Sequence, residues 1–158
     1  MDLTIAEIKI GNGYLAITPM PGRQGHYADD LGRILSWQPS LVISLATRAE
    51  LDSYAPTFAA DLAQNDCAWL HFPISDFGTP EVLWSDAARM AHRVLARNGK
   101  LLVHCMMGCG RSGMIALRLM VEAGENPKQA LIRLRSFRPC AVETDAQYTW
   151  AVNPGHVD

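Results

Sequence analysis

No run of about 18 apolar residues occurs in the sequence, so it lacks a segment that could cross a bilayer as a helix. The first residues include an acid and no basic stretch ahead of a long apolar core, and we therefore expect no secretory signal. Neither sign of charge is in excess, because 14 Lys and Arg stand against 16 Asp and Glu, giving a formal net charge of −2. Bulk electrostatics thus give no support for a nucleic acid or membrane partner.

Cysteine is also scarce, and the cysteines that occur have no paired spacing of the zinc-finger kind. Internal repeats, low-complexity tracts and linker-like stretches are absent. What remains is a chain of 158 residues with 49% hydrophobic and 19% charged residues, which is typical of a globular protein with a sizeable core. We expect a single domain over residues 1–158.

The most informative stretch is residues 104–113, His-Cys-Met-Met-Gly-Cys-Gly-Arg-Ser-Gly. The apolar residues 101–103 before it predict a buried strand, and good helix formers follow at residues 114–121. Three glycines in this stretch allow the backbone to curl so that successive N–H groups point inward. Because these groups lie at the N-terminus of a helix, the loop of residues 105–111, here called the cradle, is suited to bind a phosphate-like anion.

Two side chains add chemistry to the cradle. Arg111 supplies a planar, permanently charged fork that can bind two phosphate oxygens. Cys105 lies at the base of the loop, where the helix N-terminus and Arg111 favour the thiolate. A thiolate in a phosphate cradle is a nucleophile directed at phosphorus. Because such a thiol has to stay reduced, we expect a cytoplasmic location.

Other interpretations of the loop are weaker. Taken alone, Cys105 would be a small core residue. Residues 108–113 also fit the G-x-G-x-x-G dinucleotide pattern, but that fold needs a second strand ending in an acid about 20 residues on, and another helix follows here. The ATP-binding P-loop pattern fails because no Gly-Lys-Ser/Thr closes the loop.

Strand and helix patterns alternate along the chain. Strands are expected at residues 5–10, 14–18, 41–45, 67–74 and 101–103, the first two as a hairpin. Helices are expected at residues 29–37, 56–64, 81–97, 114–121 and 127–137, with a short last helix after Thr144 and only a capped turn after Thr47. This alternation predicts an α/β fold, a central, mostly parallel twisted sheet of about five strands flanked by helices on both sides.

A candidate proton donor follows another expected strand. In parallel sheets ligands bind at the carboxyl ends of strands, and both Cys105 and Asp76 lie just beyond such ends. Release of an alkoxide or phenoxide from phosphorus needs a proton from outside the cradle, and Asp76 could supply it. The alternative is that Asp76 only turns or caps the chain ahead of the next helix.

The cradle resembles the signature of the cysteine-dependent protein tyrosine phosphatases, which is His-Cys, five residues, Arg and then Ser or Thr. Here these residues are His104, Cys105, Arg111 and Ser112. Its position two thirds along the chain is similar to that in the dual-specificity branch, and the Asp-x-Gly-Thr-Pro of residues 76–80 is similar to kinase-associated phosphatases. The similarity extends to residues 47–51 and 141–147, and covers roughly residues 15–150.

This resemblance implies a two-step mechanism that requires no metal and no cofactor. Cys105 would attack the phosphoryl group, while Asp76 would protonate the leaving group and then activate water. Ser112 would stabilise the departing thiolate, Gln147 would orient the water, and His104 would support the cysteine. The phosphate oxygens would be bound by the cradle residues Met106, Met107, Gly108, Cys109, Gly110 and Arg111.

The expected substrate is a phosphoprotein, with phosphotyrosine and also phosphoserine or phosphothreonine as candidates and a kinase as a candidate partner. The cradle carries no lysine, whereas phosphoinositide-type relatives tend to place extra positive charge there. A phosphate-dependent binding module with little turnover is an alternative, although binding alone needs neither thiolate nor acid. A nucleotide or RNA 5′-phosphatase is another, disfavoured by the absence of a basic, aromatic-rich patch.

Two features stay open at this point. Cys109 is unusual within the cradle, and we expect it either to be a packed free thiol or to form a reversible disulfide with Cys105. Cys140 stands where relatives often have the glycine of Arg-Pro-Gly, which leaves the conformation of that loop and the place of Gln147 undetermined. Three arginines either form a solvated face or guide an acidic substrate: Arg133, Arg135 and Arg138.

Overall fold

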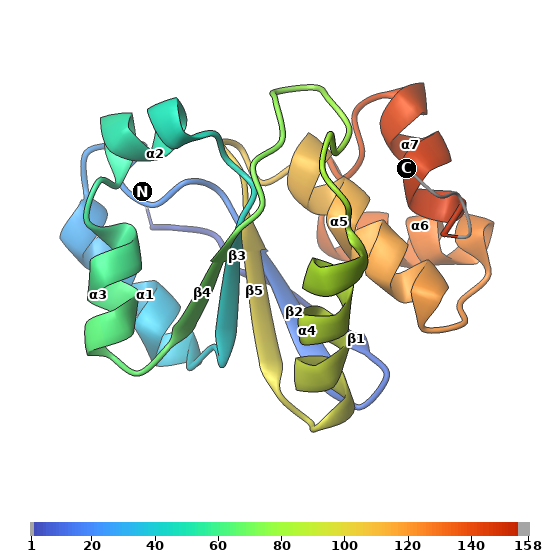
Figure 1. Cartoon of the computed structure of the whole chain (residues 1–158), viewed down its shortest axis with the longest axis horizontal. Helices are drawn as coiled ribbons and strands as arrows, with labels where there is room; N and C mark the ends of the chain where they lie inside the picture. Colours follow the sequence, from blue (N-terminus) through green and yellow to red (C-terminus); the bar gives the residue numbers. More distant parts are fainter. Residues whose placement is uncertain (1, 155–158) are drawn as a thin grey trace.

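The computed structural model describes residues 2–154, in which strands and helices alternate along the chain (Figure 1). The strands are β1 (Ala6–Ile10), β2 (Gly13–Thr18), β3 (Leu41–Ser44), β4 (Ala68–His71) and β5 (Lys100–His104). The helices are α1 (Tyr27–Trp37), α2 (Arg48–Tyr54), α3 (Phe58–Gln64), α4 (Ser85–Ala96), α5 (Gly110–Glu122), α6 (Pro127–Phe137) and α7 (Asp145–Val152). None of these helices is long and apolar enough to cross a membrane.

All five of these strands form one sheet in the order β1-β2-β5-β3-β4. β1 runs antiparallel to β2, and the other pairs are parallel, so the predicted mostly parallel α/β fold is confirmed. β5 lies at the centre, with Thr18 of β2 and Ser44 of β3 both in register with His104. The carboxyl ends of these three strands are therefore level, and the loops that follow them meet at one edge of the sheet.

The centre of the sheet is buried on both faces, because successive side chains of β2, β3 and β5 alternate between two apolar clusters. On β5, Leu101 and Val103 pack into the cluster beneath α4 and α5, whereas Leu102 packs into the cluster beneath α1 and α3. Figure 1 shows α1 and α3 on one side of the sheet and α4, α5 and α6 on the other. This two-sided burial fixes the central strand and so places the loop that leaves it.

Three boundaries differ from the sequence-based expectation by three residues or more. β4 ends at His71 rather than at residue 74, because its partner β3 ends at Ser44, the residue in register with His71. α4 begins at Ser85 rather than at residue 81. α5 begins at Gly110 rather than at residue 114, so the cradle passes into the helix without an intervening turn. Residues 48–54 form a helix where only a capped turn was expected.

Candidate functional site

The cradle lies between the centre of the sheet and the start of α5. Cys105 follows β5 directly and is buried, with 2% of its surface exposed. α5 has no side-chain cap at Cys109 and no acidic residue in its first turn, and the carboxylate of Glu143 lies next to Gly110, its first residue. The predicted strand, loop and helix thus surround a nucleophile that faces the positive end of a helix.

The cradle turns its carbonyl groups outward, where donors from other segments bind them. The bonds run from Met20 N to Met106 O at 2.9 Å, from Arg138 to Met107 O and Gly108 O at 2.8 Å each, and from Gly113 N to Cys109 O at 2.8 Å. Each of these four consecutive carbonyl groups therefore has a partner outside the loop.

The amide groups of the cradle point the other way. In a trans peptide the N–H is directed opposite to the C=O of the same unit, and there is no cis peptide bond in residues 2–154. The N–H groups of residues 107–110 therefore face the interior of the cradle, and they donate to no acceptor within residues 2–154. Such a ring of inward amides binds a tetrahedral oxyanion.

Two glycines are required for this shape. Gly108 has φ of +72°, and a Cβ there would lie 2.8 Å from the carbonyl carbon of Thr18. At Gly113 a Cβ would lie 2.5 Å from the backbone nitrogen of Val142, so a side chain would push α5 away from the segment after α6. The first glycine lets the loop curl, and the second lets a neighbouring segment approach it.

Arg111 is the largest fully buried side chain of the site, with 2% of it exposed. Its Nη1 and Nη2 donate to the two carboxylate oxygens of Glu50 at 2.7 and 3.0 Å, and Nη1 also donates to Ile74 O at 2.9 Å. This bidentate pair fixes the plane of the guanidinium. The Nε–H group donates to no acceptor within residues 2–154 and is available to a phosphate oxygen.

Glu50 is a site residue that sequence reasoning did not assign. It belongs to a capping box at the start of α2, in which Glu50 N donates to Thr47 Oγ1 and Thr47 N donates to Glu50 Oε1. Burial by itself would raise the pKa of Glu50, but the hydrogen bonds from Arg111 and Thr47 outweigh it and lower the pKa to about 2. The Thr-x-x-Glu pattern signals the helix start, but not the contact with an arginine 61 positions away.

Asp76 lies where the sequence placed it, on the loop after β4, and the structure brings it to the cradle. Its Oδ1 is 3.5 Å from Arg111 Nη2, and 59% of its side chain is exposed. The same oxygen accepts a hydrogen bond from Phe77 N at 3.0 Å, and Phe77 has φ of +60°. An exposed carboxyl beside the buried arginine is open to solvent and to a leaving group.

Gln147 and Ser112 are both fully buried next to these loops. Gln147 Nε2 donates to Gly78 O at 3.1 Å, and its Oε1 accepts from Glu143 N and Thr144 N, so the side chain joins α7 to the loop of Asp76. Ser112 lies in the first turn of α5, and its Oγ has no hydrogen-bond partner within residues 2–154. The water-orienting and thiolate-stabilising roles of these two residues stay predictions.

His104 takes part in a buried chain of hydrogen bonds. Trp69 Nε1 donates to Ser44 Oγ at 2.8 Å, Ser44 Oγ lies 2.6 Å from His104 Nε2, and His104 Nδ1 lies 3.0 Å from Cys105 O. Because a carbonyl can only accept, the proton is on Nδ1 and Nε2 accepts from the serine hydroxyl. Burial, opposed by the bond to Cys105 O and aided by the charge of Arg111, lowers the pKa of His104 to about 4.

Because His104 is buried in its neutral form, we expect the folded chain to lose stability in mild acid. The pKa of His104 in the folded chain is below its ordinary value of 6.5, so the unfolded chain takes up the proton first as the pH falls. Between pH 6.5 and 4.5 we expect the free energy of unfolding to fall by roughly 1 kcal/mol per pH unit on this account. Urea titrations at several pH values measure the slope, and a slope equally steep in His104→Gln would contradict the assignment.

Cys109 is not a free thiol and does not pair with Cys105, so both expectations for it were wrong. It forms a disulfide with Cys140, and Cys105 remains free. α6 packs against α5 and the chain then returns to the cradle, which brings two Cα atoms that are 31 positions apart to within 5.1 Å. The expectation of a reducing compartment came from the thiol of Cys105, which is free, whereas Cys109 and Cys140 are an oxidised pair.

The three arginines in and just after α6 each have partners within the chain. Arg133 binds Glu125 and Lys9 O, and Arg135 binds Ala141 O and Val142 O. Arg138 is the donor to the cradle carbonyls. Arg135 is exposed and Arg133 and Arg138 are partly exposed, so these side chains lie on a solvated face and also make intramolecular contacts.

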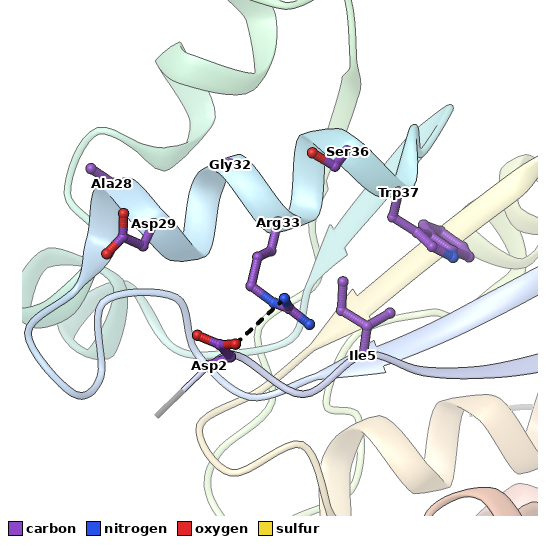
Figure 2. Close-up of a pocket in the computed structure, with 8 residues that line it drawn as sticks. All are labelled: Asp2, Ile5, Ala28, Asp29, Gly32, Arg33, Ser36 and Trp37. Carbon is purple, nitrogen blue, oxygen red and sulfur yellow. Dashed lines mark ion pairs between the residues drawn. The ribbon is translucent and has the colours of Figure 1, made fainter.

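A groove of about 680 Å³ lies between the N-terminal segment and α1, and no cradle residue lines it (Figure 2). It is lined by Asp2, Ile5, Ala28, Asp29, Gly32, Arg33, Ser36 and Trp37. Its arginine, Arg33, already donates to Leu3 O and pairs with Asp2 at 3.8 Å, and the lining holds no thiol or histidine.

Residues 2–154 also contain no group of three or more His, Cys, Asp or Glu side chains that could hold a metal ion. The cradle is therefore the candidate active site.

A model of the protein-tyrosine phosphatase family matches residues 68–154, which include Asp76, the whole cradle and Gln147. The chain belongs to the protein-tyrosine phosphatase family. Among curated relatives, cyclin-dependent kinase inhibitor 3 of Rattus norvegicus is 35% identical over 115 residues, covering 69% of this chain and 54% of the relative. The chain thus spans about half the length of the curated relatives that it matches.

Solved phosphatase structures share the fold. Kinase-associated phosphatase, with serine in place of its catalytic cysteine, superposes with a TM-score of 0.85 at 24% identity, covering 97% of this chain and 94% of that one. PTPMT1 in complex with PI(5)P superposes with a TM-score of 0.76 at 14% identity, covering 94% and 93%. The resemblance to kinase-associated phosphatases is confirmed, and the same fold occurs in a protein solved in complex with PI(5)P.

Proposed function

We propose that this chain hydrolyses phosphate monoesters on proteins through a cysteinyl-phosphate intermediate. The observation that carries the proposal is the cradle itself, in which four inward amides and the Nε–H of Arg111 surround the position next to Cys105. Asp76, 3.5 Å from Arg111, supplies the acid that a binding loop would not need. Membership of the protein-tyrosine phosphatase family supports the same chemistry.

The first step is transfer of the phosphoryl group to sulfur. The Cys105 thiolate forms a bond to phosphorus as the bond from phosphorus to the ester oxygen breaks, and Asp76 gives its proton to that oxygen. The cradle amides and Arg111 bind the three equatorial oxygens, where charge is spread in the transition state. Because Glu50 holds the guanidinium in place beforehand, little reorganisation is needed during the step.

The second step returns the free cysteine. A water molecule attacks phosphorus as the bond to sulfur breaks, and Asp76, now a carboxylate, accepts the proton of the water. The Ser112 hydroxyl, buried without another partner, donates a hydrogen bond to the departing thiolate. The side-chain amide of Gln147 has two N–H groups. One donates to Gly78 O, and the other orients the water. The products are inorganic phosphate and the original thiolate.

The substrate we propose is a phosphoprotein, with phosphotyrosine as the main target and phosphoserine and phosphothreonine as further targets. The cradle residues contain no lysine that would add charge for an inositol phosphate. The similarity to cyclin-dependent kinase inhibitor 3 supports a phosphorylated kinase as the partner. Comparing release of phosphate from phosphotyrosine, phosphothreonine and phosphoinositide substrates, with EDTA present, tests this choice.

The nucleophilic thiol of Cys105 has to stay reduced, which favours a location in the cytoplasm.

Asp76→Asn is expected to lower kcat by about a hundredfold or more on phenyl phosphate, because the leaving phenoxide then lacks its proton donor. The loss on para-nitrophenyl phosphate should be smaller, since nitrophenolate departs more readily without a proton. Asp52→Asn, at an exposed position of α2, is the matched control and should keep wild-type rates. Equal losses on both esters would argue that Asp76 does not protonate the leaving group.

A further inference from the structure

Residues 138–142, here called the brace, run along the outer side of the cradle. Arg138 donates from Nε to Gly108 O and from Nη2 to Met107 O, each at 2.8 Å. Cys140 is joined to Cys109 by the disulfide, and Val142 N donates to Cys109 O at 3.3 Å. Three ties of different chemistry therefore connect this segment to three successive cradle residues.

The brace is itself held firmly. Arg135 binds Ala141 O and Val142 O at 2.9 Å each, and Ala141 N donates to Arg138 O at 2.9 Å. Val142 is a β-branched residue with φ of +68°, a conformation that persists only where the surroundings enforce it. A segment held this way can serve as a fixed frame for the loop that it contacts.

The Arg138 bonds set the direction of the phosphate-binding amides. The carbonyls that Arg138 binds belong to the same peptide units as the N–H groups of Gly108 and Cys109. Holding these carbonyls outward keeps the two N–H groups pointing inward, and the disulfide restrains the next residue of the loop. Arg138 therefore acts on phosphate through the backbone and makes no contact with the substrate itself.

We propose that the brace positions the cradle amides, with Arg138 as a positioning residue and the Cys109–Cys140 disulfide as a redox-sensitive part of the same device. A dithiol reduces the bridge by giving up two electrons and two protons, which yields two cysteine thiols and the cyclic disulfide of the reductant. A small disulfide such as glutathione disulfide reverses the exchange and leaves as two thiols. Reduction removes one of the three ties and weakens phosphate binding. The proposal rests on the proposed function of the cradle.

The test measures the affinity of inorganic phosphate for the Cys105→Ser chain, so that no turnover occurs and oxidation of the nucleophile plays no part. Calorimetric titration is carried out after treatment with glutathione disulfide or with dithiothreitol, and mass spectrometry verifies the bridge. We expect the Kd to be about threefold lower in the oxidised chain. The difference should vanish when Cys140→Ser is added. Equal affinities in the two verified states, or no bridge after oxidation, would overturn the redox part.

Arg138 is tested in the same background. Arg138→Ala should raise the Kd for phosphate about tenfold in both redox states, because two backbone hydrogen bonds are lost, and Arg138→Lys should recover part of the affinity. Arg133→Ala is the matched control, since that arginine binds Glu125 and Lys9 O, and it should leave the Kd unchanged. An Arg138→Ala chain with a lower Tm but wild-type phosphate affinity would reduce Arg138 to a structural role.

Turnover by the wild-type chain tests the phosphatase proposal separately. Phosphate affinity that responds to Arg138 and to the bridge in a chain without turnover would support the brace and overturn only the phosphatase. Absence of phosphate binding to the oxidised chain would overturn the brace, whatever the turnover.

Discussion

Replacing Cys105 with serine is expected to abolish hydrolysis of para-nitrophenyl phosphate, with a loss of at least about a thousandfold in kcat. The serine hydroxyl has nearly the same size, but it does not ionise in the cradle and so provides no nucleophile. The amides and Arg111 are unchanged, and the variant should still bind phosphate. The measurement is initial-rate kinetics under reducing conditions, with phosphate binding followed by calorimetry.

Cys67→Ser provides the matched control. Cys67 is the other free cysteine of residues 2–154, but burial raises the pKa of its thiol and it packs in the cluster beneath α1 and α3. Its replacement should leave kcat unchanged. Full activity in Cys105→Ser would contradict a cysteinyl-phosphate mechanism, whereas a folded wild-type chain that binds phosphate without turnover would point to a binding module.

Arg111→Lys is expected to lower kcat by about a thousandfold, because an arginine that stabilises the charge of a transferring phosphoryl group contributes about 10³ to 10⁵ in rate. Lysine keeps the charge but has no planar fork, so it does not bind Glu50 and phosphate at the same time. Steady-state kinetics on the same ester measure the effect. Arg97→Lys, at an exposed position after α4, is the control and should be neutral.

Glu50→Gln separates orientation from charge in the same site. The guanidinium is retained, but it loses the bidentate carboxylate that fixes its plane at 2.7 and 3.0 Å. We expect a loss of about tenfold in kcat/KM, which is smaller than for Arg111→Lys. A larger loss in Glu50→Gln than in Arg111→Lys would indicate that Glu50 has another function in the site.

The sequence was sufficient for the parts of the site that are local. The apolar residues 101–103, the glycines of the loop and the helix formers at 114–121 predicted the strand, loop and helix, because these features depend on neighbouring residues. Asp76 could be placed near the cradle because strands of a parallel sheet end at the same edge. The structure confirms that placement through its contact with Arg111.

The parts that were missed depend on distant segments. The partner of Arg111 is Glu50 in the first turn of α2, and the two meet because β3, which precedes α2, lies next to β5 in the sheet. The Cys109–Cys140 disulfide depends on how α6 packs against α5. The spacing of apolar residues along the sequence does not indicate that packing. The contact between Arg138 and the cradle could not be predicted either. Arg138 binds backbone carbonyl groups, which every residue has, so no residue type in the sequence marks its partners.

The central place of β5 also bears on how the chain acquires its structure during synthesis. β1 and β2 pair with each other, as do β3 and β4, but these two pairs share no ladder until β5 enters between β2 and β3. On a ribosome the first four strands are synthesised before residue 100, so the ladders that join the two pairs can form only after β5 follows. The strand that joins them ends at His104, next to Cys105. A nascent chain therefore completes its sheet and places its nucleophile in the same event.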